Sequence, residues 1–163
     1  MPKSQPELRE LAARVAGSAN LLDVRMLKTT VEHRGFPSGE YPMTYTLDIQ
    51  PSAQFNEERH SLVVTSDFRM DMGEVMGDDR DGDVSEIATL EFTYVALFDT
   101  PQGVTFEADE LNSFGATTGI FSIYPYAREY VQDMTGRLGL PPLTLDVYRV
   151  PASVNVQNNE ADS

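Results

Sequence analysis

The chain has 163 residues, of which 40% are hydrophobic and 23% charged, and it carries a net charge of −14. Such a chain is long enough for one soluble domain with a substantial core, and its negative field opposes binding to nucleic acids and to anionic membrane surfaces. The absence of cysteine excludes disulfides, thiol catalysis and cysteine-ligated zinc. No apolar run approaches the roughly 20 residues of a membrane span, and the N-terminus lacks the pattern of a secretory signal, so we expect a cytoplasmic protein.

The first element expected is a helix over residues 6–19. Ser4 and Glu7 have the spacing of a capping box, in which the serine caps the helix start and the glutamate reaches back to the serine backbone. The apolar residues that follow recur at helical spacing and form one face: Leu8, Leu11, Ala12 and Val15. The Gly-Ser pair at residues 17–18 ends or bends this helix.

Four strands are expected next, because apolar and polar residues alternate over residues 22–31, 43–49, 62–71 and 88–98. The clearest alternation lies in the second of them, whose apolar members are Met43, Tyr45, Leu47 and Ile49. An acidic loop with several glycines, residues 73–86, separates the last two strands.

The last third of the chain predicts a short helix or turn over residues 106–114 and then a longer helix. Pro125 suits the first turn of the longer helix, where a missing N–H costs nothing. Gly139 and the two prolines at 141–142 end that helix. The residues after them form a short strand or an extended exit.

The longer helix carries two apolar stripes, which is more than packing on one sheet requires. The first consists of Ala127, Val131, Met134 and Leu138 at helical spacing. The second is aromatic and consists of Tyr126 and Tyr130. Residues of this kind are most often buried in a core, but the second stripe can also face another subunit.

This order of elements indicates an α+β fold of two layers. The N-terminal helix and the long C-terminal helix pack on one face of a four-stranded antiparallel meander. The other face of the sheet is polar enough to meet water: it carries Thr44, Thr46, Asp48, Thr65, Asp67, Asp71, Glu91 and Thr93. We expect residues 1–150 to form a single domain and the polar residues 151–163 to be a disordered tail.

The sequence contains no recognisable pattern of catalysis, metal binding or cofactor binding. The acidic loop resembles a calcium loop, but aligning Gly82 with the glycine of an EF-hand places Gly77 and Ala88 where carboxylates are required. His33 and His60 belong to no metal or triad motif, and we expect both at the surface. Glycine-rich phosphate loops are absent. We therefore expect no metal, no cofactor and no enzymatic activity.

Three motifs in the last third of the chain occur together: Ala-Thr-Thr-Gly at residues 116–119, Tyr-Pro-Tyr at 124–126 and Thr-Gly-Arg-Leu-Gly-Leu-Pro-Pro-Leu-Thr-Leu at 135–145. In these motifs the chain resembles the SecB export chaperones, and more closely the SecB-like chaperones encoded beside toxin–antitoxin pairs. The likeness is weaker over residues 1–99, where mainly the order of elements agrees. The N-terminal helix and the absence of a second C-terminal helix match the toxin–antitoxin branch.

The resemblance implies a small antiparallel sheet with helices on one side. It also implies a dimer of dimers in which the long helices are buried between pairs. In such an assembly the oligomer interface includes Tyr126, Tyr130 and Met134, which gives the second stripe a role.

The function that the resemblance implies is that of an ATP-independent holdase, which binds unfolded or nascent polypeptides in apolar grooves. The chain contains many methionine and aromatic side chains. Such side chains suit surfaces that bind peptides of many different sequences. The residues that we expect to contact such a client are Tyr45, Phe98, Val104, Phe106, Leu143 and Leu145.

Two biological roles stay open within this class. One is to guard a labile antitoxin in a toxin–antitoxin system, and the other is to deliver precursors for Sec-dependent export. For export, the resemblance implies an acidic sheet face that receives the SecA translocation ATPase, and the candidates are Asp67, Asp71 and Glu91. The alternative from another class is a small-ligand-binding or scaffold protein that uses the same apolar groove.

Overall fold

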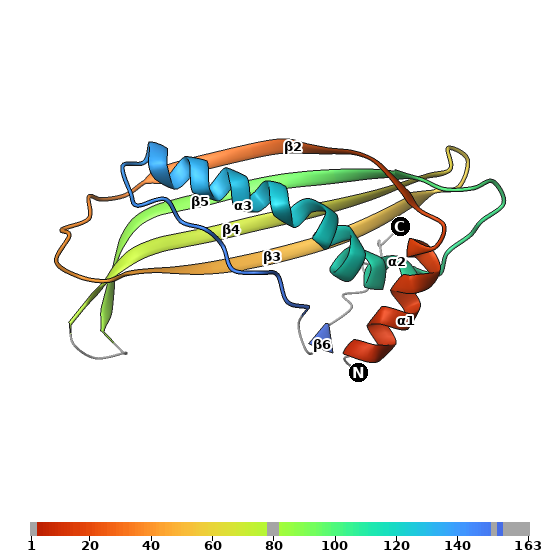
Figure 1. The fold of residues 1–163 in the computed structure, drawn as a ribbon, viewed down its shortest axis with the longest axis horizontal. Coiled ribbons are helices and arrows are strands. Elements are labelled where there is room, and N and C mark those ends of the chain that lie inside the picture. Colours follow the sequence, from red (N-terminus) through yellow and green to blue (C-terminus); the bar gives the residue numbers. More distant parts are fainter. Residues whose placement is uncertain (1–2, 78–81, 151–152, 155–163) are drawn as a thin grey trace, which may run out of the picture.

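The computed structural model describes residues 3–77, 82–150 and 153–154 (Figure 1). Its helical elements are α1 (Gln5–Ala16), α2 (Ala108–Phe114), the π-helical turn η1 (Gly115–Gly119) and α3 (Ile120–Arg137). Its strands are β1 (Lys3–Ser4), β2 (Asn20–His33), β3 (Met43–Asn56), β4 (Ser61–Met76), β5 (Asp83–Asp99) and β6 (Ser153–Val154). None of the helices in this described part of the chain is long and apolar enough to cross a membrane.

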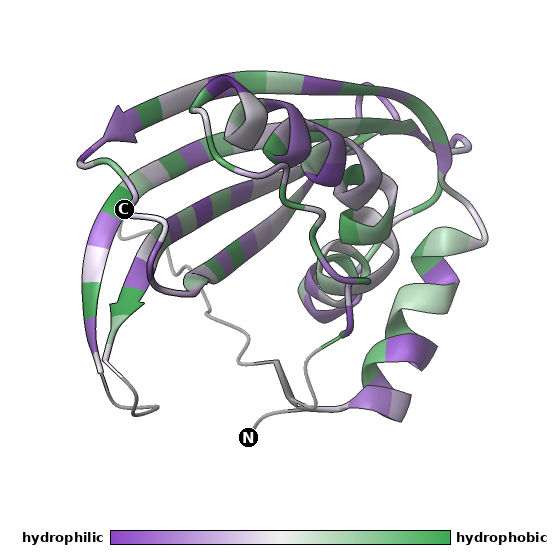
Figure 2. Cartoon of the chain, turned by 60° about the vertical axis from the view of Figure 1, so that its left-hand side comes forward, coloured by the Kyte–Doolittle hydropathy of each residue, from purple (hydrophilic) through white to green (hydrophobic). Residues whose placement is uncertain are grey.

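The four expected strands are all present, and each is longer than its alternation in the sequence indicated. Over residues 62–72 of β4 and 88–98 of β5 the even-numbered residues face the core and are buried, as the alternation predicts. Phe68 lies opposite Phe92 in the register, and their rings stack with centroids 4.8 Å apart. Figure 2 shows the resulting hydrophilic and hydrophobic bands along the strands. Because each Å² of buried apolar area contributes about 25 cal/mol, this face is a main source of stability.

The strand order is β2-β5-β4-β3, and every neighbouring pair is antiparallel. The predicted meander is therefore wrong for one strand: β3, β4 and β5 form a meander, whereas β2 pairs with β5 at the far edge. The connection from β2 to β3 crosses the ends of two strands. The N–H groups of Arg34 and Gly35 donate to the Ile87 carbonyl at 2.7 and 3.1 Å, and the Val75 N–H donates to the Pro42 carbonyl at 3.0 Å. These hydrogen bonds hold the crossing in place.

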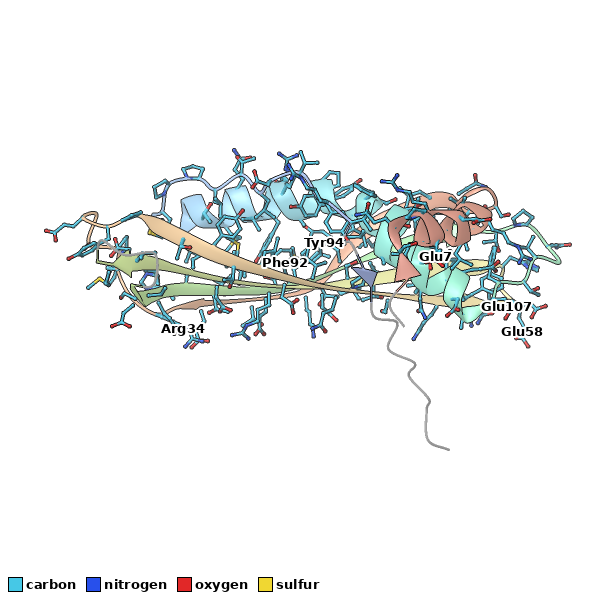
Figure 3. The ribbon with its side chains drawn as sticks, turned by 90° about the horizontal axis from the view of Figure 1, so that it is seen from below. Glu7, Arg34, Glu58, Phe92, Tyr94 and Glu107 are labelled. Carbon is cyan, nitrogen blue, oxygen red and sulfur yellow. The ribbon has the colours of Figure 1, made fainter. Side chains whose placement is uncertain are left out.

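The helices all lie on one side of the sheet, as expected (Figure 3). α3 runs along the sheet, and α1 packs against α2 at one end (Figure 1). The buried face of α1 consists of Leu8, Ala12 and Val15. At its start the Ser4 N–H donates to the Glu7 carboxylate at 2.8 Å, which confirms the predicted capping box.

The long helix begins earlier than predicted. α2, which matches the short helix expected over residues 106–114, continues through η1 into α3 without a break, and Pro125 lies inside α3. The residues just before the proline, Ile120, Ile123 and Tyr124, are buried in the core. Their burial outweighs the backbone hydrogen bond that Pro125 cannot donate. Pro125 itself lies on the exposed side of the helix.

α3 ends at a glycine, as the sequence predicts. Gly139 has a φ of +75°, and the Leu140 N–H donates to the Thr135 carbonyl at 3.0 Å, which is the outer hydrogen bond of a Schellman cap. The chain then returns along α3 toward α1 in extended form over residues 141–150, which we call the return segment (Figure 1). The Tyr124 hydroxyl anchors this return segment by donating to the Asp146 carbonyl at 2.7 Å. Of the two exits predicted, the structure therefore has the extended one.

Within residues 151–163 the structure describes Ser153–Val154, which pair antiparallel with Lys3–Ser4. The two ends of the described chain thus lie side by side. The remainder of the predicted tail, residues 151–152 and 155–163, lies outside the described residues. A single domain over residues 1–150 stays a prediction.

Candidate functional site

A groove of about 630 Å³ opens between α1, the η1–α3 junction and the return segment. A volume of this order lies within the usual range of ligand sites. We call it the α1 groove, and its lining residues come from three distant parts of the sequence: Gln5, Arg9, Ala12, Ala13, Ala16, Thr117, Thr118, Phe121, Tyr148, Arg149 and Val150.

One wall of the α1 groove is a stripe of α1 that runs at helical spacing from Gln5 to Ala16. The opposite wall is formed by Phe121 and Tyr148, whose rings meet edge-on with centroids 5.2 Å apart. The side-chain amide of Gln5 donates to the Val150 carbonyl at 2.8 Å and joins the two walls. Because Phe121 is 47% exposed, a large apolar side chain of a ligand can pack against it.

An ion pair fixes the position of α1 on α2. The Arg14 guanidinium donates to the Glu110 carboxylate at 2.7 Å, and the same carboxylate accepts the Glu107 N–H at 2.9 Å. The hydrogen bond from the Glu107 backbone, together with Arg14, holds the pKa of Glu110 below its ordinary value against the opposing effect of burial. The α1 wall of the groove is therefore held by a charged contact as well as by its apolar face.

A second set of exposed apolar side chains lies at the opposite end of the sheet, on the β2–β3 connection and at the nearby ends of β3, β4 and β5 (Figure 1). Its aromatic residue Phe36 is 89% exposed. Aromatic and methionine side chains can repack against different partners. We call this set of side chains the sheet-end patch, and its members are Phe36, Tyr41, Met43, Met76 and Val84.

The β2–β3 connection that carries Phe36 is fastened to β4 by Glu74. Its carboxylate accepts the backbone N–H of Ser38 at 3.0 Å, the N–H of Gly39 at 3.1 Å and the Ser38 hydroxyl at 3.1 Å. The hydrogen bond from the Ser38 backbone is the largest of the effects that hold the pKa of Glu74 below its ordinary value of 4.5. His33 packs edge-on against Phe36 with ring centroids 4.8 Å apart. The patch is thus carried by a loop with defined contacts.

None of the six predicted client contacts lines the α1 groove. Phe98 and Leu145 are 3% and 1% exposed. The core of the subunit covers both side chains, and their contact with a client stays a prediction. The other four are half-buried in the subunit: Tyr45, Val104, Phe106 and Leu143.

The aromatic stripe of α3 divides between core and surface. Tyr130 is buried, its ring centroid lies 4.6 Å from that of Phe92, and its hydroxyl is hydrogen-bonded to a threonine of β2. This placement agrees with the core alternative for Tyr130, and its place at a subunit interface stays a prediction. Tyr126 is 47% exposed beside Tyr94, and Met134 is half-buried. Figure 3 shows Phe92 and Tyr94 between the sheet and α3, where burial raises the pKa of Tyr94 to about 12.

The three carboxylates predicted for a partner face lie together on the helix-free side of the sheet, the side on which Arg34 projects (Figure 3). Arg69 joins two of them, because it donates to Asp71 at 3.1 Å and pairs with Glu91. The third carboxylate belongs to Asp67, which lies two positions before Arg69 on β4. The structure thus brings these three predicted residues onto one surface.

Hydrogen bonds keep this face charged. Burial raises the pKa of Asp71, but hydrogen bonds from Thr89 and Arg69 outweigh burial and hold that pKa below its ordinary value. A shallow hollow of about 220 Å³ lies on the same face, with Asp67 and Glu91 in its lining. The surface therefore suits a partner that carries positive charge.

Among residues 3–77, 82–150 and 153–154, no three His, Cys, Asp or Glu side chains are placed to hold a metal ion. Residues 78–81 of the acidic loop lie outside this part, so the calcium interpretation is not tested there. His33 is exposed, as expected, whereas His60 is half-buried in the turn between β3 and β4.

Sequence reasoning did not find the α1 groove, although it found α1 itself. Phe121 precedes the expected helix start at Pro125, so its outward position could not be deduced. The one signal in the sequence is the stripe of α1 beside its buried face, where Gln5, Arg9 and Ala13 recur at a spacing of four. Ordinary exposed helices also carry such rows of polar and small side chains, so this signal alone does not predict a groove.

No model of a protein family matches the chain. The SecB-like chaperone Rv1957 of Mycobacterium tuberculosis (strain ATCC 25618 / H37Rv) is 35% identical over 159 residues, which cover 91% of this chain and 88% of that protein. The protein-export protein SecB of Paracoccus denitrificans (strain Pd 1222) is 27% identical over 119 residues, or 73% of this chain and 62% of that one.

The chain is also similar, in fold as well as in sequence, to a solved structure. It is that of the Mycobacterium tuberculosis Rv1957 SecB-like chaperone in complex with a ChAD peptide from the Rv1956 HigA1 antitoxin. The likeness has a TM-score of 0.76 at 34% sequence identity and covers 87% of this chain and 99% of that one. With this shared fold and a relative 35% identical along nearly its whole length, the chain belongs to the SecB-like chaperone family.

Proposed function

We propose that this chaperone is an ATP-independent holdase that binds short apolar stretches of unfolded or nascent polypeptides. The observation that carries the proposal is the pair of open apolar surfaces, the α1 groove and the sheet-end patch, on a chain of a chaperone family. Both surfaces present aromatic rings that a client side chain can reach. Membership in this family agrees with the expectation that the chain is not an enzyme, and it weighs against a small-ligand-binding or scaffold protein.

The natural client that we propose is a segment of an antitoxin, so that the chaperone keeps a toxin silent in the cytoplasm. The support is the solved relative, which is a complex with an antitoxin peptide and whose chain is matched over 99% of its length. The α1 groove is open along α1 and the return segment. An extended peptide is a suitable occupant of such a groove.

Delivery of precursors for export is a second role, favoured by the charged helix-free face. Asp67, Asp71 and Glu91 lie together there, and Arg69 neutralises only part of their charge. We propose this surface as the one that would receive a SecA-like ATPase. A homo-tetramer built as a dimer of dimers belongs to the same proposal, and the exposed Tyr126 and half-buried Met134 on α3 support it.

Each apolar surface binds weakly by itself. Burial of client surface contributes about 25 cal/mol per Å², whereas ordering a disordered chain costs much of this gain. Two surfaces at opposite ends of a subunit, repeated in an oligomer, let one client chain engage several of them. Such multivalent binding strengthens retention without new contacts.

Suppression of aggregation tests this function. The purified chaperone is mixed at a stoichiometric ratio with a chemically denatured protein, and light scattering is followed after dilution, with and without ATP. We expect suppression that ATP does not change. Phe121→Ser and Phe36→Ser each remove an exposed aromatic ring, so we expect each variant to require roughly fivefold more chaperone for half-suppression.

Val147→Ser is the matched control, because Val147 is 68% exposed and lies in neither surface. We expect this variant to behave as the parent protein does. Failure of the parent protein to suppress aggregation at a stoichiometric ratio would refute the holdase function. Equal loss in the control would refute the assignment of the two surfaces.

A further inference from the structure

The α1 groove differs in charge from the rest of the molecule. The chain has 26 acidic and 12 basic residues and a net charge of −14. The lining of this groove nevertheless contains two arginines, Arg9 and Arg149, and no carboxylate. The shallow hollow on the helix-free face, by contrast, has acidic residues in its lining. The groove is therefore a locally positive site on a strongly negative protein.

Neither arginine forms an ion pair with a residue in the part of the chain that the structure describes. Within the described part of the chain, the arginines at 14, 25, 34, 69 and 137 take part in ion pairs, whereas Arg9 and Arg149 take part in none. Both are exposed, one on α1 and the other on the return segment. Their guanidinium groups are thus available to carboxylates of a bound molecule, and an arginine fork suits a carboxylate particularly well.

The apolar part of the groove provides room for a bulky side chain. The α1 wall contributes Ala13 and Ala16, whose small side chains leave space, and Phe121 and Tyr148 provide an aromatic surface opposite. The volume of about 630 Å³ exceeds what one side chain fills, so several residues of a peptide can enter. Apolar space therefore lies directly beside two unpaired positive charges.

We propose that the α1 groove selects peptide segments in which a large apolar side chain has acidic neighbours. This specificity rests on the holdase function proposed above and adds a charge rule to it. The apolar side chain packs between α1 and Phe121, and the flanking carboxylates pair with Arg9 and Arg149. The negative field of the remaining surface repels acidic segments elsewhere, so the two arginines decide where such a segment binds.

Binding of labelled synthetic peptides to the full-length chaperone, followed by fluorescence anisotropy, tests the proposal. The three peptides share a Leu-Trp-Leu centre and differ only in flanks of two glutamates, two glutamines or two lysines on each side. At low ionic strength we expect the glutamate peptide to bind about fivefold more tightly than the glutamine peptide, and the lysine peptide to gain nothing at this groove. We expect salt at about 0.5 M to remove the preference.

The double variant Arg9→Gln and Arg149→Gln is expected to lose the preference for glutamate flanks while it still binds the glutamine peptide. The matched control is the double variant Arg25→Gln and Arg59→Gln. It changes the net charge by the same amount at exposed positions outside the groove, and we expect it to keep the preference.

Equal affinity of the parent protein for the glutamate and glutamine peptides at low salt would overturn the charge rule and leave the holdase function standing. A preference that survives in the Arg9 and Arg149 variant would also overturn it. If none of the three peptides binds, the charge rule is wrong, and the aggregation assay then decides separately whether the holdase function survives.

Discussion

At the scale of single residues, Gly119 shows how closely the helical layer approaches the sheet. A Cβ atom built at this position would lie 2.9 Å from both methyl carbons of Val64 on β4. Val64 is fully buried, so a methyl group at position 119 would force Val64 or η1 to shift. The Ala-Thr-Thr-Gly motif at residues 116–119 thus has a packing role, because its glycine lets η1 rest directly on the sheet.

Gly119→Ala is expected to lower the free energy of unfolding by about 1–3 kcal/mol, the usual cost of overpacking a core. Gly136→Ala is the matched control, since nothing lies within 4 Å of a Cβ at that position of α3. Alanine favours the helix over glycine, so we expect the control to gain up to about 1 kcal/mol. Urea unfolding followed by circular dichroism measures both changes. Equal stability of the two variants would contradict this packing.

At the scale of elements, the sequence predicts what depends on local periodicity. Alternation placed Leu47, Phe68 and Phe92 on the inner face of the sheet, and the structure buries or half-buries all three. The neighbour of β2 could not be predicted in the same way, because strands that follow one another are neighbours only about two-thirds of the time. The helix start predicted at Pro125 was wrong for a related reason. Proline prefers the first turn of a helix, but tertiary packing of the residues before it outweighed this local preference.

Glu74 controls one of these unpredicted features, the crossing from β2 to β3. Its carboxylate accepts three hydrogen bonds from Ser38 and Gly39, and its pKa lies below the ordinary value of 4.5. Because the pKa of Glu74 is lower in the folded state, the ionised carboxylate stabilises the folded protein at pH values above the pKa of the unfolded state. This stabilisation is lost as the pH falls through the folded pKa.

We expect Glu74→Gln to be less stable than the parent protein at pH 7. The difference should persist to about pH 5.5 and then shrink as the pH falls below the ordinary glutamate pKa, because the parent carboxylate becomes protonated. Unfolding by urea at several pH values between 7 and 3 measures this difference. Glu40→Gln, an exposed position on the same connection, is the control and should differ little from the parent. A Glu74→Gln difference as large at pH 3 as at pH 7 would contradict the account.

At the scale of the whole molecule, the open apolar surfaces lie at the two ends of the sheet, and a charged face lies on the side without helices. The α1 groove brings together residues near 5–16, 117–121 and 148–150. No local pattern joins these three segments, so the groove could not be found before the fold was known. Phe98 and Leu145 were predicted to be accessible, yet the structure buries both. The reason is that apolar character alone does not separate core residues from exposed ones.

The central claim is that unfolded chains bind to the α1 groove and the sheet-end patch. Photo-crosslinking tests it most directly, with benzoylphenylalanine placed at position 121, 36 or 91 in turn and a denatured client added before irradiation. The account predicts crosslinks to the client from positions 121 and 36, and few or none from position 91 on the helix-free face. Crosslinks that are strongest from position 91, or absent from both 121 and 36, would contradict it.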